Sequence, residues 1–429
     1  MKKGNKEVLV RQGRPLVVGT PPALVQAFGR VKDSLEDFCL RAGLESLEEL
    51  MVRDVRSLCG ERHVRAEARC GYRWGVTQGA APYRGRLLRL ERPRVRGKDG
   101  AELMLPSWQA VTGERLLERA AHELMLLNVS TRKYRRALLP LAPEPIAGDG
   151  ASRSAVSRRF MAMSEQKLSQ WLSSDLAKLD LLAIQIDGLT VADHVLVAAL
   201  GIDGEGGKHP LALVEGATEN ATVVQALLDD LLERGLDAKR VYLFIVDGAK
   251  ALKRAIRRTF GADTPIQRCQ IHKARNIVGR LPERLHRSVR VALKQAWEQD
   301  DAEHGEQMIR NLARRLEHEA PGVSKSILEG IDEILTASRL GLSAALKRSL
   351  ACTNIIENAN GTVRLVTRNV KRWRNAKMAL RWVGAGLMEA HKTFRRLKAY
   401  RDLPLLRAAL QRIADRRRVA KTNALPLAA

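Results

Sequence analysis

Two aspartates end two similar apolar runs. Asp187 closes the run LLAIQIDG (181–188), Asp247 closes VYLFIVDG (241–248), and a glycine follows each of them. A short apolar run bounded by turn residues is typical of a strand buried on both faces. Because such a strand tolerates a charge poorly, we expect both carboxylates at or near open strand ends. Two adjacent strands ending this way would bring like charges together, and a divalent cation relieves that repulsion.

A third acid, Glu357, lies in the run TNIIENANG (353–361) and could complete the site. Gly361 and Arg364 follow it at spacings that place all three on one helix face. The basic residues of this region include Arg364, Arg368, Lys371 and Arg372. We expect them to continue the row and to contact DNA phosphates, which would position a strand without reading its sequence. Alternatively, they only solvate an exposed helix or pair with acids such as Glu317 and Glu319.

The elements that must position these acids alternate between strands and helices. Strands are expected at 181–188, 194–203, 209–216, 241–248 and 265–272, and helices at 220–235 and 249–261. The glycine-rich link between the second and third strands is a hairpin-type turn, so the first three strands are antiparallel. Thr218 or Asn220 caps the first helix. This order, β-β-β-α-β-α-β, is that of the ribonuclease H fold, in which the first and fourth strands are neighbours and Asp187 and Asp247 converge.

Charge and composition favour a nucleic-acid partner. The 429 residues include 74 Lys and Arg against 48 Asp and Glu, a net charge of +26. Such an excess suits a polyanion, with nucleic acid first and a membrane surface second. No apolar run approaches the length of a spanning helix, and the basic N-terminus lacks the apolar core of a signal peptide. We therefore expect a cytoplasmic protein without a membrane partner, and the odd number of scattered cysteines, five, suits reduced thiols.

Two sets of cysteine and histidine have spacings that suggest zinc. Cys59, His63 and Cys70 lack a fourth partner at the usual spacing, so the zinc signal is weak. Cys269 and His272 form a C-x2-H half-site with no second pair behind it. A structural or DNA-positioning role suits that pair better than zinc.

The region before the acids is expected to bind DNA. A helix from 114 to 127, a turn at 128–130 and a second helix through Leu138 precede a basic helix that Ser152 or Ser154 caps. This layout is that of a helix-turn-helix DNA reader, and the alternative is a bundle packed on the core. The candidate DNA contacts on the basic helix are Arg153, Arg158 and Arg159. Upstream, we expect helix with a break at Gly43, then a basic strand or hairpin at 86–95, either a solvated edge or a DNA contact.

These patterns divide the chain into six regions. We expect an N-terminal region with a basic strand or hairpin, a mainly helical helix-turn-helix region, a first part of the core, an all-helical insertion, a final core helix carrying Glu357, and a basic, partly disordered tail. Their bounds are 1–110, 111–175, 176–275, 276–345, 346–395 and 396–429.

A set of motifs in consistent order carries a family resemblance. They are RLERPRVRG, NVSTRKYRRAL, SAVSRRF, IQIDGL, LGIDGEGGKHPLALVEGATENATV, VDGAKAL, QRCQIHKARN, TNIIEN and RNVKRWR. From about residue 80 to 400 the chain resembles bacterial insertion-sequence transposases of the Mutator-like DDE class. The resemblance implies a ribonuclease H-like α/β core, a mixed five-stranded sheet split by an all-α insertion. It also implies Asp187, Asp247 and Glu357 as the DDE triad, and Cys269 and His272 as the C-x2-H motif after the fifth strand.

The resulting expectation is a DNA transposase of the bacterial nucleoid. Two Mg²⁺ ions (or Mn²⁺) on the three acids would support cleavage of one DNA strand and joining of its 3′-OH to a target. Partners would be double-stranded DNA, as terminal inverted repeats and as target, and a second copy of the chain in a homodimer or higher oligomer. One alternative is a structure-selective nuclease or resolvase on the same fold. Another is a transposase-derived repressor without catalysis.

Overall fold

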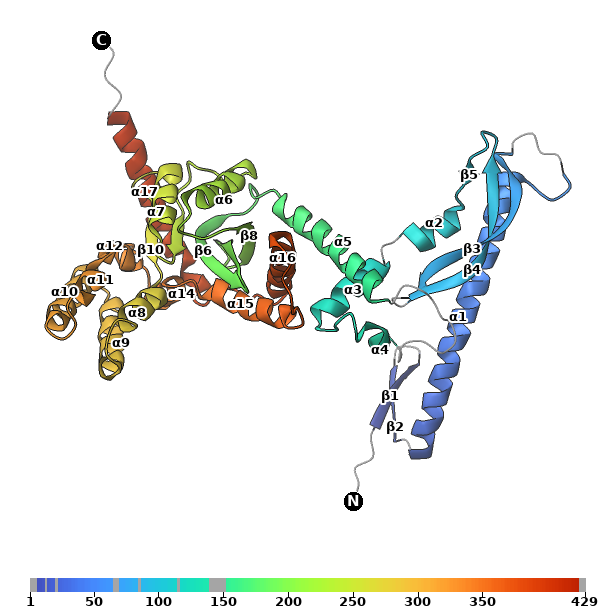
Figure 1. Cartoon of the computed structure of the whole chain (residues 1–429), viewed down its shortest axis with the longest axis horizontal. Coiled ribbons are helices and arrows are strands. Elements are labelled where there is room, and N and C mark those ends of the chain that lie inside the picture. Colours follow the sequence, from blue (N-terminus) through green and yellow to red (C-terminus); the bar gives the residue numbers. More distant parts are fainter. Residues whose placement is uncertain are drawn as a thin grey trace, which may run out of the picture. The chain divides into compact units, whose positions relative to one another are not determined.

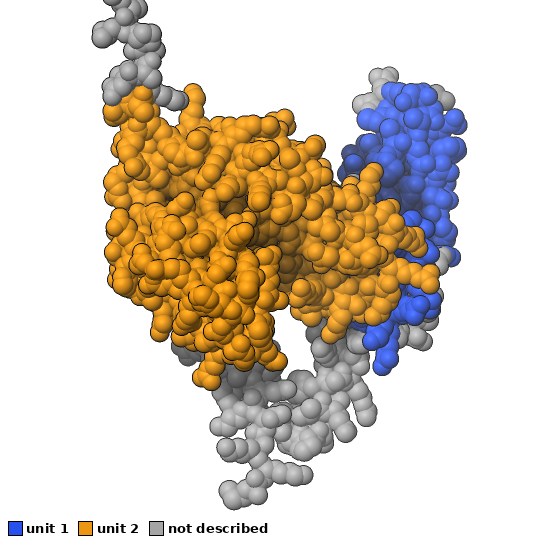
Figure 2. Space-filling model, turned by 60° about the vertical axis from the view of Figure 1, so that its left-hand side comes forward, with its two compact units in different colours: residues 1–125, 129–163 blue, residues 126–128, 164–429 orange. Residues whose placement is uncertain are grey.

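A computed structural model describes residues 6–11, 14–19, 22–64, 69–83, 86–113, 116–138 and 152–423 (Figure 1). The chain divides into two compact units, residues 1–125 with 129–163 and residues 126–128 with 164–429 (Figure 2). The boundary at 163/164 falls inside helix α5 (Arg153–Leu172), so this one helix contributes to both units. The finer division into six regions remains a prediction.

The first unit combines small sheets with helices. Its elements are β1 (Lys6–Arg11), β2 (Arg14–Gly19), α1 (Pro22–Cys59), β3 (Gly71–Tyr83), β4 (Arg86–Gly97), β5 (Glu102–Leu103), α2 (Pro106–Gly113), α3 (Leu116–Leu126), α4 (Tyr134–Leu138) and the first part of α5. The antiparallel pair β1–β2 was not predicted. The predicted break at Gly43 was wrong, because α1 runs through it. A glycine costs a helix about 1 kcal/mol, and α1 buries Leu47 and Met51 against the β3–β4 sheet, which offsets that cost.

The predicted basic strand is present as β4, paired with β3 in an antiparallel hairpin. Arg94 and Arg96 lie over the ring of Trp74, at 4.0 and 4.9 Å from its centroid. Arg94 also pairs with Glu102 at 2.9 Å. Trp74 remains 42% exposed. The hairpin therefore presents arginine and aromatic groups on one surface, and its contact with DNA stays a prediction.

Helices α3, α4 and α5 share a small apolar cluster that contains Ala121, Tyr134 and Val156. The Oγ of Ser152 accepts a hydrogen bond from the Ala155 amide at 3.3 Å, so Ser152 is the predicted cap of α5. The middle helix, α4, has only 5 residues. The predicted link before Ser152 lies outside the described residues. The helix-turn-helix interpretation of this cluster remains a prediction.

The second unit is built on a mixed five-stranded sheet in the order β10-β9-β6-β7-β8. Its strands and the two helices between them are β6 (Leu181–Val191), β7 (His194–Asp203), β8 (Lys208–Glu215), α6 (Ala221–Glu233), β9 (Leu243–Val246), α7 (Lys250–Phe260) and β10 (Ile266–Arg268). Strands β6, β7 and β8 are antiparallel, and β9 is parallel to β6 and β10. The predicted order of elements and the predicted first-to-fourth strand pairing are confirmed.

Each face of this sheet has its own apolar core, which follows from the two-residue period of a strand. On β7, Val197 and Ala199 join the cluster under α6 and α7. Leu196, Ala198 and Leu200 of the same strand join a cluster with helices from the C-terminal part of the chain. These C-terminal elements are α15 (Asn354–Thr367), α16 (Ala376–Lys392), the 3₁₀ turn η2 (Tyr400–Asp402) and α17 (Leu403–Asn423). The core is therefore a sheet between two helical layers.

Every regular element between β10 and α15 is a helix, in agreement with the pattern expected for that stretch. These helices are α8 (Gln270–Val278), α9 (Glu283–Trp297), α10 (Ala302–Glu317), α11 (Val323–Leu328), α12 (Ile331–Ile334), α13 (Thr336–Arg339) and α14 (Ala344–Leu350). Helices α8 to α12 enclose a separate apolar cluster around Leu293 and Leu312. The last strand was predicted too long, because β10 ends at Arg268. The Cys269 carbonyl already accepts from the Lys273 amide, which begins α8.

The stretch 396–429 was predicted as a partly disordered tail, and this prediction was wrong for residues 403–423, whereas residues 424–429 lie outside the described residues. Residues 403–423 form α17, because Leu403, Leu406 and Leu410 recur at helical spacing and are buried in the core. Arg407 of this helix pairs with Asp180, just before β6. Among the described helices, none is both long and apolar enough to cross a membrane.

Candidate active site at the ends of β6 and β9

The strand register brings the two aspartates to neighbouring positions. Parallel pairing of β6 with β9 ends where Ile186 lies opposite Val246, so Asp187 and Asp247 are the next residues on adjacent strands. Adjacent strands are about 4.8 Å apart. The prediction placed both aspartates at or near open strand ends. Asp187 does not lie at the end of its strand, because β6 continues to Val191 against β7. Only its parallel pairing stops at the acid.

Asp187 is a buried carboxylate, 6% exposed. Its Oδ1 accepts a hydrogen bond from the Gly188 amide at 2.9 Å. Burial raises the pKa of Asp187, and the negative charge of Asp247 raises it further. The nearby Thr353 hydroxyl and the charge of His272 lower the pKa of Asp187 without cancelling that rise. A buried anion under this repulsion is a site at which a cation would be stabilised.

Asp247 is held by hydrogen bonds to both carboxylate oxygens. The Thr218 hydroxyl donates to Oδ2 and the Ala249 amide donates to Oδ1, each at 2.9 Å. Of the two residues expected to cap the next helix, Asn220 is the cap, because its side chain accepts from the Thr222 amide at 3.0 Å. Thr218 was considered only as a cap, so its role in orienting Asp247 was missed. Its position in the loop before α6 gave no signal of that contact.

Glu357 lies on the first turn of α15, where its amide donates to the Thr353 carbonyl at 3.1 Å. Its Oε1 is 3.7 Å from His272 Nε2 and 3.4 Å from Arg275 Nη1. Both partners come from α8, the helix that follows β10. The pairing of Glu357 with Arg275 was not predicted, because the two residues are 82 positions apart.

Cys269 and His272 lie between the acids, in the C-x2-H motif. The Thr353 hydroxyl donates to the buried Cys269 sulfur at 3.5 Å. Burial would raise the pKa of the Cys269 thiol, but its contacts with His272 and Thr353 lower it below the usual value. The contact with Cys269 raises the pKa of His272 to about 9, although burial alone would lower it. The charges of Asp187 and Glu357 add to the rise. His272 is therefore a cation at neutral pH that links two of the acids.

One ring nitrogen of His272, the buried Nδ1, has no hydrogen-bond partner among the described residues. The imidazolium is therefore held by surrounding charges and by its position on α8. It supplies positive charge between Asp187 and Glu357 in the protein alone.

A buried glutamine connects β6, the strand of Asp187, with the start of α15, the helix of Glu357. Gln185 is fully buried on β6, and its Nε2 donates to the Cys352 carbonyl at 3.0 Å. Cys352 directly precedes Thr353, so this bond fixes the start of α15 beside the strand that carries Asp187. The signal was visible as the one polar residue inside the apolar run 181–186.

The acids have suitable chemistry for a divalent cation, but they are not preassembled around one. In the described part of the chain, no three His, Cys, Asp or Glu side chains are grouped so that they could hold a metal ion. Carboxylate oxygens are the ligands that Mg²⁺ prefers, and the raised pKa of Asp187, caused mainly by its burial, shows that the ionised form of this carboxylate lacks the solvation that a cation could supply. Binding by all three acids would require Glu357 to exchange His272 and Arg275 for the ion.

The predicted row of basic residues after Glu357 does not continue along one helix. Helix α15 ends at Thr367, with Arg368 as its C-cap, so Lys371 and Arg372 lie in the following loop. The continuous row was therefore wrong. Asn375 begins a new helix by accepting from the Met378 amide, which requires a turn here. Arg364 and the other three are exposed.

The alternative partners proposed for these basic residues are not used in the described structure. Glu319 pairs with Arg284 of α9 at 3.2 Å, and no ion pair involving Arg364 occurs among the described residues. In the first unit, Arg153 and Arg158 are exposed on α5, whereas Arg159 is half-buried and its charge acts on Tyr134. The DNA contacts assigned to all these residues remain predictions.

Comparisons with known proteins identify a family and several relatives. The family model described as "Transposase, Mutator family" matches residues 24–397. The transposase for insertion sequence element IS256 in transposon Tn4001 of Staphylococcus aureus is 27% identical over 77% of this chain and 84% of its own length. The transposase for ISRM5 of Rhizobium meliloti is 25% identical over 87% of this chain and 92% of its own. That for IS6120 of Mycolicibacterium smegmatis is 28% identical over 58% and 76%.

Proposed function

Because the chain belongs to the Mutator family of transposases, we propose that it cleaves and joins DNA at a metal site formed by Asp187, Asp247 and Glu357. The observation that carries this proposal is the end of the β6–β9 pairing, which makes Asp187 and Asp247 neighbours at one edge of the sheet. Glu357 comes from α15, and its Oε1 lies 3.7 Å from His272 Nε2. His272 also feels the charge of Asp187, so one cation connects Glu357 with the acid on β6. The strand order and directions support a ribonuclease H-like core.

Two Mg²⁺ ions (or Mn²⁺) on these acids would stabilise the attacking and leaving oxygens of a phosphodiester. The remaining residues orient the ligands. Thr218 and the Ala249 amide fix the two oxygens of Asp247. Gln185 and Thr353 hold the start of α15 and thereby the backbone of Glu357. His272 and Arg275 pair with the Glu357 carboxylate and hold it on the side of α15 that faces α8.

The substrate we propose is the terminal inverted repeats of an insertion sequence, together with a target duplex. The excess of 74 Lys and Arg over 48 Asp and Glu favours DNA. The first unit would read the repeats through α5 and its exposed Arg153 and Arg158. Because two ends of one element must be joined together, the working form would be a homodimer or higher oligomer. The site of action would be DNA of the bacterial cytoplasm.

A strand-transfer assay tests this function against its alternatives. Purified protein, Mg²⁺ and duplexes ending in the inverted repeat of the element are incubated with a plasmid target. We expect cleavage at the repeat end and covalent joining of that end to the plasmid. Cleavage without joining would indicate a nuclease or resolvase, and binding without cleavage would indicate a repressor.

A further inference from the structure

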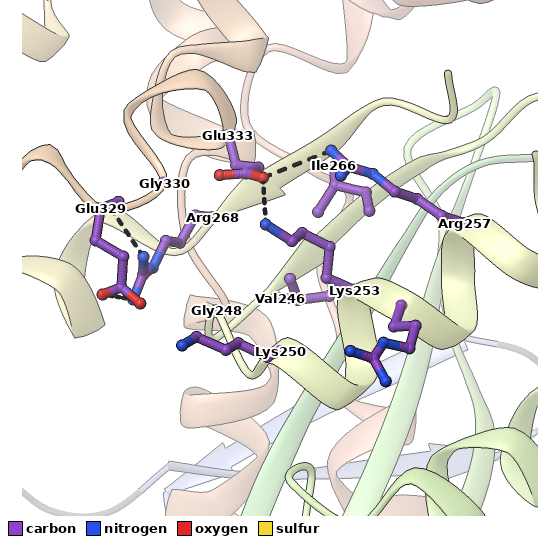
Figure 3. Close-up of a pocket in the computed structure, with 11 residues that line it drawn as sticks. Val246, Gly248, Lys250, Lys253, Arg257, Ile266, Arg268, Glu329, Gly330 and Glu333 are labelled. Atoms are coloured by element: carbon purple, nitrogen blue, oxygen red, sulfur yellow. Dashed lines mark hydrogen bonds and ion pairs between the residues drawn. The ribbon is translucent and has the colours of Figure 1, made fainter. Parts of the chain in front are cut away.

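A cationic cavity begins immediately beside Asp247. It has a volume of about 420 Å³ and lies between the end of β9, the first turns of α7, β10 and the turn between α11 and α12 (Figure 3). Its floor includes the apolar Val246 and Ile266. The basic side chains that line it are Lys250, Lys253, Arg254, Arg257 and Arg268. Their number exceeds that of the lining acids, Glu329 and Glu333, and the cavity therefore favours an anion.

The acids at the cavity neutralise only part of this charge. Glu333, 12% exposed, pairs with Lys253 at 2.7 Å and with Arg257 at 3.5 Å, and Figure 3 shows both side chains directed to it. Lys250 and Arg254 are exposed on the same helix. Neither has a hydrogen-bond or ion-pair partner in the part of the chain that the structure describes. Two cations at the mouth of the cavity thus remain available to a ligand.

Arg268 forms a largely buried wall of the cavity and keeps one hydrogen-bond donor unpaired among the described residues. Its side chain is 11% exposed, and Nη1 donates to the Glu329 carbonyl at 3.0 Å. Two glycines in left-handed conformations leave room for it. A Cβ at Gly248 (φ +102) would lie 2.3 Å from Arg268 Nε, and one at Gly330 (φ +69) would lie 2.7 Å from Nη1. Arg268 Nε is buried without a partner among the described residues.

We propose that this cavity binds a backbone phosphate of the DNA strand next to the bond that is cut. The inference rests on the proposed function, because it takes Asp247 as a ligand at the scissile phosphate. Gly248 follows Asp247 and lines the cavity, so a strand passing over the acids carries a neighbouring phosphate to Lys250 and Arg254. Lys250 and Arg254 carry the cationic groups that contact phosphate oxygens, and a phosphate contact positions a strand without reading its sequence.

The test is a double-mutant cycle in which positive charge is removed from the protein and negative charge is removed from the DNA, separately and together. Single-turnover cleavage is measured on repeat-end duplexes in which one phosphate near the scissile bond at a time is replaced by a neutral methylphosphonate. The protein variant is Lys250→Gln with Arg254→Gln. The control is Arg258→Gln, which lies on α7, is exposed and does not line the cavity.

We expect the wild type to lose about tenfold in rate at one such position, as for a lost charged hydrogen bond. The double variant should be about tenfold slower on natural DNA and lose nothing further at that position. The Arg258→Gln control should behave as wild type. A variant that still loses tenfold there, or that cleaves natural DNA at the wild-type rate, overturns the proposal.

Two further outcomes distinguish this inference from a binding site for a free anion and from failure of the proposed function itself. Calorimetric binding of inorganic pyrophosphate that the double variant abolishes, together with a flat methylphosphonate scan, would assign the cavity to a free anion and overturn the DNA assignment. A wild-type chain that cleaves no DNA would count against the proposed function alone. The same cycle would then be measured as binding affinity, where the loss at one phosphate must disappear in the double variant.

Discussion

At the scale of single residues, the site is a balance of charges around His272. Asp187 is buried and its pKa is raised, while Glu357 is paired with cations from α8. The protein alone therefore satisfies part of the negative charge with an imidazolium. Replacing that partner by divalent ions is the step on which the proposed activity depends.

Arg364 tests whether the exposed face of α15 touches DNA. We expect Arg364→Ala to slow cleavage of all DNA ends about tenfold, because one phosphate contact is lost, and to leave repeat discrimination unchanged. Single-turnover rates on repeat and scrambled ends measure this. The matched control is Arg287→Ala, an exposed arginine of α9. A normal cleavage rate with a lowered melting temperature would mean that Arg364 only stabilises its helix.

At the scale of elements, an ion pair between Arg407 and Asp180 adds to the apolar packing that holds α17 on the core. The hydrogen bonds from Arg407 of α17, with those from Arg240, lower the pKa of Asp180 to about 2. An unfolded aspartate titrates near pH 3.9. The native state therefore gains stability above about pH 4 that is lost as the pH falls toward 2.

Asp180→Asn should remove this stabilisation. Because the side chain is 52% exposed, solvent screening reduces the effect, and we expect a loss of about 1 kcal/mol in unfolding free energy at pH 7. The gap to wild type should narrow below about pH 4 in urea titrations. Asp193→Asn, an exposed acid in the β6–β7 turn, is the control. A gap that persists unchanged at pH 3 would show that the contribution is not ionic.

Helix α5 carries the predicted DNA reader. Replacing Arg158 and Arg159 by Ala should weaken binding to the terminal repeat, since one or both are expected to contact its DNA. Fluorescence anisotropy with repeat and unrelated duplexes measures the effect, and Arg290→Ala of α9 is an exposed control. Unchanged repeat affinity in the double variant would move the reader elsewhere, with the Arg94–Trp74 face of the β3–β4 hairpin as the next candidate.

The sequence predicted those elements whose signals are local. The apolar runs gave the strands of the core and, with the hairpin turn, their order. What it could not predict depends on distant contacts. Helix α1 passes Gly43 because a sheet covers its next turns, and α17 forms because the sheet buries its leucines. The bonds from Thr218 to Asp247 and from Gln185 to Cys352 join segments far apart in the chain.

At the scale of the whole molecule, DNA recognition and catalysis are expected to be separable. The division into two units falls within α5, so a fragment of residues 1–175 retains that helix intact. We expect it to bind terminal-repeat DNA without the catalytic core. Its affinity should fall linearly with salt on logarithmic axes, because bound phosphates release counterions. Binding only by the full chain, or binding insensitive to salt, would contradict this separation.

The central claim is that three carboxylates form one metal-dependent site. The measurement is single-turnover cleavage and joining of repeat-end DNA over a Mg²⁺ titration, for wild type, Asp187→Asn, Asp247→Asn, Glu357→Gln and the control Asp193→Asn. We predict Mg²⁺-dependent activity in wild type and the control. Each of the three variants should lose cleavage and joining while keeping end binding and melting temperature. Near-normal joining by any one of the three, or full activity without a divalent ion, would contradict the account.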